Sequence, residues 1–278
     1  MLVRANRGDS NYHGLQTTVT RQVGRFALRG DYTWSRSIDN TSEVFTTSGG
    51  TTRWENVNAP RSDRGPSAFH RTTRAVFSYT YEAPAFKGKG FLTYVLGGWA
   101  TSGVVSFQSG TPETIYLGGY DQYGDGESYN DRPSWGNPAA VLNYSADCRT
   151  RGSGCITGLG YNDGSGNLVD YFSRAAGSLQ DFRYIMYPRN SGIYGNVSRN
   201  TFYYPGRQDW NLSVVKRINM PYAEGHQFEL RLDMFNAFNH PNLGVGGLNG
   251  NALSSTFLDV ASTKRGGRTM AVWAKYSF

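Results

Sequence analysis

Residues 26–36 read FALRGDYTWSR and alternate between apolar and polar side chains. Successive side chains of a β-strand point to opposite faces, so this pattern predicts one strand with two unlike faces. Arg29 and Asp31 lie in the middle of the polar face, and burying such charges in a closed protein core would be costly. The polar face must therefore meet water, and the face with Phe26 and Trp34 must meet an apolar medium. A strand in the wall of a membrane β-barrel meets both conditions.

The same alternation recurs in six more segments of the chain. They are longer than the ~5–6 residues of an average strand, and they match the ~9–11 residues that a tilted strand needs to cross a membrane. We therefore expect an all-β protein, an antiparallel transmembrane β-barrel, with seven strands in this chain. The six further segments are residues 11–22, 72–83, 98–108, 208–218, 226–238 and 267–278.

The links between these strands alternate between long and short. Outer-membrane barrels have short periplasmic turns and long extracellular loops, so the alternation predicts that the carboxyl terminus is periplasmic. Residues 109–207 then form a long extracellular loop region, and a strand pair hidden inside it would preserve the alternation. Counted from the carboxyl end, the links are 239–266 (long), 219–225 (short), 109–207 (very long), 84–90 (short), 37–71 (long) and 23–24 (minimal).

The composition suits strands with one wet face. Only 38% of the residues are hydrophobic, yet 14% are aromatic and 35 are glycine, whereas disordered chains are poor in aromatic residues. The net charge is +7, but the arginines are scattered and no nucleic-acid motif is present, so we expect no nucleic-acid partner. The first residues, MLVRANRGDSN, lack the apolar segment of a signal peptide.

Seven charged residues are predicted to lie on the wet faces of the strands and to face the lumen of the barrel. They could line a path for a ligand or contact a plug, or they could form ion pairs that only satisfy the wet face. The alternation does not separate these readings. The residues are Arg29, Asp31, Arg74, Glu82, Glu229, Arg231 and Asp233.

The longest link carries two further candidates. Cys148 and Cys155 are expected to form a local disulfide, because the bacterial envelope is oxidising and the spacer between them contains glycine; free thiols and a metal pair are the alternatives. Two Asp-rich stretches have spacings loosely like those of a calcium loop, but such clusters are also ordinary turn chemistry, and we expect no metal. These stretches contain Asp163, Ser165, Asn167 and Asp170 in one case, and Asp121, Asp125 and Glu127 in the other.

The chain ends in AVWAKYSF, again with alternating side chains. We expect Val272, Ala274, Tyr276 and Phe278 to face lipid, with the two rings in the aromatic girdle of the interface. This ending resembles the carboxyl-terminal signal that the bacterial barrel assembly machinery recognises. Outer-membrane lipid and that machinery are therefore expected partners. An edge strand of a soluble protein is the alternative.

An odd number of strands is unusual, because single-chain bacterial barrels have even numbers. We therefore expect residues 1–278 to be the carboxyl-terminal part of one barrel domain, without plug or signal peptide. The sequence also resembles the TonB-dependent receptors, and among them the Oar-like barrels. The stretches that carry the resemblance are SNYHGLQTTVTRQ, FALRGDYTWSRSID, DRGPSAFHRTTRAVFSYTYEAP, LGGWATSGVVSFQSGTP, GNVSRNTFYYPGRQDWNLSVVKR, FELRLDMFNAFNHPNLG and RTMAVWAKYSF.

The resemblance implies that the chain supplies the last seven strands of a barrel of about 22 strands with a plug. Such a receptor moves a bulky ligand across the bacterial outer membrane, with energy from the TonB system acting through an amino-terminal part that this sequence lacks. The ligand stays unknown, and we expect no cofactor and no enzymatic activity. The alternatives are a small structural or adhesive barrel without energised transport, an outer-membrane hydrolase built around His240, and a secreted sugar-binding β-sandwich.

Overall fold

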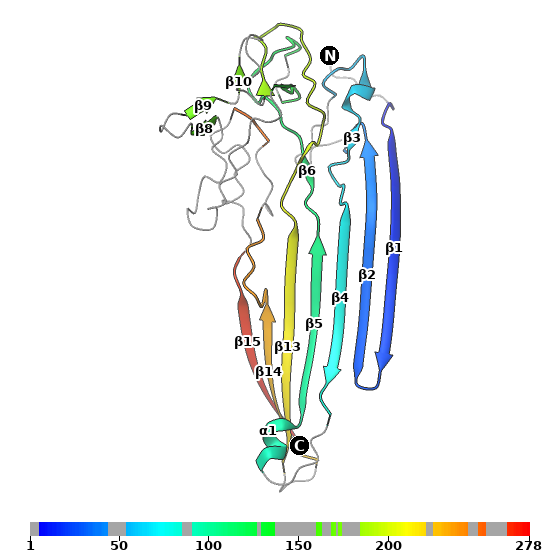
Figure 1. The fold of residues 1–278 in the computed structure, drawn as a ribbon, viewed down its shortest axis with the longest axis vertical. Helices are drawn as coiled ribbons and strands as arrows, with labels where there is room; N and C mark the ends of the chain where they lie inside the picture. Colours follow the sequence, from blue (N-terminus) through cyan, green and yellow to red (C-terminus); the bar gives the residue numbers. More distant parts are fainter. Residues whose placement is uncertain are drawn as a thin grey trace.

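The computed structural model describes residues 6–43, 54–84, 91–126, 129–136, 160–162, 168–170, 172–173, 184–220, 225–243, 250–253 and 266–278. Seven long strands form one antiparallel sheet in chain order (Figure 1). All seven strands predicted from the alternation are therefore present. They are β1 (Ser10–Val23), β2 (Phe26–Asp39), β4 (Thr73–Glu82), β5 (Trp99–Gln108), β13 (Arg207–Asn219), β14 (Gln227–Phe235) and β15 (Thr269–Ser277).

The register brings the like faces of the seven strands together. Leu28 is paired with Tyr79, Tyr79 with Gly103, and Gly103 with Leu212. Residues paired in this way point to the same side of a sheet, so one side is apolar across all strands. We call it the apolar face; its large residues include Leu15, Val19, Phe26, Leu28, Tyr32, Trp34, Phe77, Tyr79, Tyr81, Val105, Phe107, Trp210, Leu212, Val214, Phe228, Leu230, Leu232, Met234, Met270, Val272 and Tyr276.

The apolar face is not covered by other parts of the described chain. Leu15 is 59% exposed and Val272 is 72% exposed. Within the seven long strands, Val105 is the one hydrophobic residue counted as buried. A soluble sheet would bury such a face against a second layer, so this face is built to meet a non-aqueous medium.

The described parts of the long links gather at one end of the sheet, where they form a packed unit that we call the loop module (Figure 1). Its apolar core comprises Ile115, Leu117, Tyr184, Met186, Val197 and Ala252. Its short elements are η1 (Pro60–Asp63), β3 (Gly65–Pro66), β6 (Pro112–Glu113), β7 (Ser134–Trp135), β8 (Gly160–Asn162), β9 (Leu168–Asp170), β10 (Phe172–Ser173), β11 (Tyr184–Ile185) and β12 (Phe202–Tyr203). Among these short strands, β3 pairs with β2, and the others pair among themselves.

The hidden strand pair considered for residues 109–207 does not enter the main sheet. β5 pairs directly with β13, from Gln108 with Arg207 to Trp99 with Lys216. β6 pairs with β12 and β7 with β11 in separate small sheets. Among the described residues, the sheet therefore has seven long strands, with β1 and β15 at its two edges.

The short links lie at the other end, near the carboxyl terminus (Figure 1). β1 and β2 are joined by Gly24 and Arg25, and Gly24 has a positive φ of 55°, which suits a tight hairpin. The link before β5 is longer than the predicted residues 84–90, because a short helix, α1 (Phe91–Leu96), precedes that strand. Gly98, with φ 73°, follows the helix in the left-handed conformation that commonly ends one.

Within the described residues, no helix combines the length and the apolar character that crossing a membrane requires.

Candidate functional site: the polar face and the loop module

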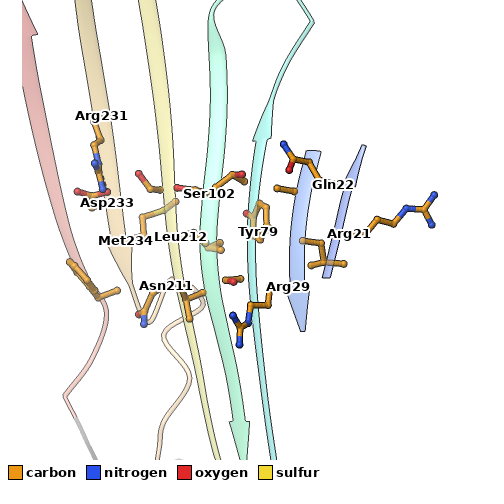
Figure 2. A pocket seen from close by; sticks show the side chains of 18 of the residues that line it. Arg21, Gln22, Arg29, Tyr79, Ser102, Asn211, Leu212, Arg231, Asp233 and Met234 are labelled. Carbon is orange, nitrogen blue, oxygen red and sulfur yellow. Dashed lines mark hydrogen bonds and ion pairs between the residues drawn. The ribbon is translucent and has the colours of Figure 1, made fainter. Parts of the chain in front are cut away.

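The side of the sheet opposite the apolar face carries the charges, and we call it the polar face. The register places all seven residues predicted to face a lumen on this one side. A groove of about 470 Å³ crosses its middle, lined mostly by polar-face residues of six strands (Figure 2). Arg29, Arg231 and Asp233 line it together with Ser102 and Asn211. That this side faces a lumen remains a prediction.

Four of the predicted charges form two ion pairs, each within a single strand. Arg29 Nε donates to Asp31 Oδ2 at 2.9 Å, and Thr18 of β1 also donates to Asp31. On β14, Arg231 Nε donates to Asp233 Oδ1 at 2.8 Å. Residues i and i+2 share a face of a strand, so these pairs are local products of the alternation. The arginines are half-exposed, and such pairs add little stability.

A third arrangement crosses several strands and depends on Arg217, which the sequence analysis missed. Arg217 lies on β13; its Nε donates to Glu229 Oε2 of β14 at 2.9 Å, and its Nη1 lies 3.4 Å from Glu82 Oε1 of β4. The intervening strand β5 places the small side chain of Ala100 opposite Glu82, so the guanidinium can reach across it. Arg217 continues the alternation of Ser213 and could have been found by extending it.

Arg74 lies apart from these pairs. It is near the start of β4, at the end of the sheet where the loop module lies, opposite Thr33 and Gln108.

The loop module contains buried charges that the sequence analysis did not identify. Arg132 is 4% exposed and lies between Glu55 and Asp63, with Nη1 2.6 Å from Asp63 Oδ1 and Nη2 in contact with Glu55 Oε2. Burial raises the pKa of Glu55 to about 8, and the positive charge of Arg132 opposes this rise. Arg199 and Asp39 form a second buried pair. Because these partners are far apart in the sequence, no local pattern predicts their pairing.

Glu113, at the edge of the loop module, gives a test by pH. Burial raises its pKa from the usual range to about 7, opposed by a 2.8 Å hydrogen bond from Tyr204 Oη. A raised carboxyl pKa stabilises the folded state below about pH 4.5, and this stability is lost as pH rises to about 7. We expect the pairing of β6 with β12 to lose on the order of 2 kcal/mol over this range.

The measurement is hydrogen exchange of the Tyr204 amide, which donates to Thr111 O, corrected for the intrinsic effect of pH. Glu113→Gln should remove the pH dependence. An unchanged dependence in this variant would assign the effect to another group.

The predicted assembly signal lies partly in the sheet. Val272, Ala274 and Tyr276 are on the apolar face of β15, and Phe278 follows the strand and is 93% exposed. The rings of Tyr276 and Phe278 lie 6.3 Å apart, and His226 contacts both. Recognition by the assembly machinery stays a prediction.

Several other predicted residues lie outside what the structure describes. These include Cys148 and Cys155, so the disulfide stays a prediction. Glu127, Asp163, Ser165 and Asn167 also fall outside the described ranges, and Asp170 is described only as part of β9. His240 is described: it lies in the turn after β14, where its ring contacts the amide of Gln208 at 2.9 Å.

Comparisons with known proteins agree with the two-faced sheet. Residues 1–271 match the family model described as "Outer membrane beta barrel domain". Neither the curated proteins nor the solved structures gave a match. The family match spans nearly the whole chain. The apolar face of the sheet supplies the surface that would contact lipid. The chain therefore belongs to the family of outer membrane β-barrel domains, and it is located in the bacterial outer membrane.

Proposed function

We propose that this chain forms part of the wall of a TonB-dependent transporter of the Oar-like kind, which moves a bulky ligand across the outer membrane. The observation that carries the proposal is the groove on the polar face. Charged and small polar side chains line much of it, beside apolar ones such as Val104 and Phe235, whereas small barrels fill their interior with packed side chains. A wide, wet interior suits a large barrel that holds a plug or passes a ligand.

The two edge strands support a larger barrel. Strands alternate in direction along the sheet, so β1 and β15, the first and seventh, run the same way. They cannot pair antiparallel with each other, and closing an antiparallel barrel requires an odd number of further strands. If two copies with the same orientation in the membrane met edge to edge, β15 of one copy would run parallel to β1 of the other. A second copy therefore cannot close an antiparallel barrel either. A barrel of about 22 strands, as in plugged transporters, meets the condition.

The ion pairs of the polar face fit the same role. Arg217, Glu82 and Glu229 are partly exposed and remain available to exchange partners with a plug or a ligand. Because each pair is weak in water, such an exchange would cost little.

Conductance in planar bilayers tests the proposal on the native protein purified from outer membranes. A plugged transporter should be closed at rest and should conduct reversibly when moderate urea loosens the plug. The small structural or adhesive barrel would stay closed in both conditions. Closure in urea, or a channel that is open at rest, would contradict the proposal.

A further inference from the structure

Three carboxylates of the loop module lie together, away from the polar face of the sheet. Asp121, Asp125 and Asp131 each place one side-chain oxygen within 4.8 Å of the other two. Two of them come from the turn 121–126, and the third comes from the segment that leads into β7. The cluster is asymmetric, since Asp131 is fully buried and Asp125 is exposed.

Asp131 provides an observation independent of the clustering. Its Oδ2 accepts a hydrogen bond from the backbone N of Gln122 at 2.6 Å. Its Oδ1 is buried and has no hydrogen-bond donor among the described residues. A buried carboxylate oxygen without a donor is costly. A cation bound to this oxygen would offset that cost.

Two arginines near the cluster, Arg132 and Arg189, contact other groups through their guanidinium groups. Arg132 follows Asp131 directly, but its guanidinium contacts Glu55 and Asp63. Arg189 donates to Gly119 O at 3.1 Å and lies over the ring of Tyr120. Both arginine guanidinium groups thus have partners outside the cluster of three carboxylates.

We propose that Asp121, Asp125 and Asp131 bind a divalent cation, with Ca²⁺ as the expected ion. Ca²⁺ takes oxygen ligands at about 2.3–2.6 Å, so two ligands of one ion can lie up to about 5 Å apart. Mg²⁺ binds at about 2.0–2.1 Å in near-ideal octahedra and would require a tighter cluster. Oxygens that all lie within 4.8 Å of one another meet the limit for Ca²⁺, whereas the limit for Mg²⁺, about 4.2 Å, is narrower.

The site would fasten a surface turn to the core of the loop module. The backbone O of Asp131 accepts a hydrogen bond from Leu117 N at 2.8 Å, and Leu117 is a fully buried member of that core. Asp121 organises the turn, because its carboxylate accepts from Gly124 N and Gly126 N. A bound ion would link these two elements. With three carboxylates, we expect a dissociation constant of about 0.1–1 mM, as in extracellular calcium modules.

Terbium luminescence tests the site in the native protein, purified from outer membranes and stripped with EDTA. Tyr120 and Tyr123 flank Asp121 in the sequence, so excitation of tyrosine should sensitise bound Tb³⁺. We expect Ca²⁺ to displace this signal. Asp125→Asn should raise the half-saturating Tb³⁺ concentration at least tenfold, and Asp131→Asn should do the same.

Asp125 is exposed, so its variant keeps the test valid even if Asp131→Asn fails to fold. Asp9→Asn removes an exposed carboxylate outside the cluster and should change the half-saturating concentration less than twofold. A signal that Ca²⁺ does not displace would overturn the proposal. So would equal Tb³⁺ binding by Asp125→Asn and Asp9→Asn. Neither outcome depends on whether the protein transports a ligand.

Discussion

Arginine in place of Val214 should lower the free energy of unfolding in a lipid bilayer by about 2–4 kcal/mol. Val214 lies near the middle of β13 on the apolar face, opposite Thr101 and Leu232. A charge at this depth faces hydrocarbon and has no water to solvate it. Urea titration of the native protein in vesicles measures the effect, and the heat-modifiable mobility of folded barrels reports assembly.

Val215 is the matched control, because it is the next residue and the same side chain on the other face. It pairs with Ala100 and Arg231, and Glu229 and Asp233 lie diagonally across from it. Arginine at this position would reach water and two carboxylates, so we expect a loss below about 1 kcal/mol. If Val215→Arg cost as much as Val214→Arg, the assignment of the two faces would be wrong.

The strands could be predicted because lipid and water impose opposite demands on adjacent residues. In β2, every second residue from Phe26 to Trp34 is aromatic, aliphatic or glycine, so the period is written directly in the sequence. Lys216 breaks this pattern on the apolar face of β13. Its ammonium lies over the Trp99 ring and donates to the carbonyl groups of Val95 and Gly97. These partners come from α1 and the turn after it, which the alternation does not describe.

The loop module could not be predicted in the same way. Its core joins Ile115, Tyr184, Val197 and Ala252, which come from separate segments without a common period. The acidic cluster shows the same limit. Spacing in the sequence grouped Asp121 and Asp125 with Glu127, whereas the fold brings Asp131 to them. Contacts across long links depend on tertiary packing, and local sequence patterns do not predict such packing.

Methionine in place of Arg132 should destabilise the loop module by about 3–5 kcal/mol, because it leaves the buried Asp63 carboxylate without its cation and the Glu55 carboxyl group without the guanidinium that contacts it. Glu55 and Asp63 are the partners, at 3% and 1% exposure. Hydrogen exchange measures the loss at two amides of the module, Leu117 N, which donates to Asp131 O, and Val197 N, which donates to Pro133 O. Their exchange should accelerate about a hundredfold or more. The β13–β14 amides should keep their protection, because the long strands form their own ladder.

Two further variants separate the lost charge from the lost volume. Arg61→Met changes an exposed arginine of η1 and should leave exchange at both amides within about threefold of the parent protein. Adding Asp63→Asn to Arg132→Met should restore part of the protection, because it removes the charge that Arg132→Met leaves unpaired. If the added Asn restores nothing, packing of the Arg132 side chain, rather than charge balance, holds the module together.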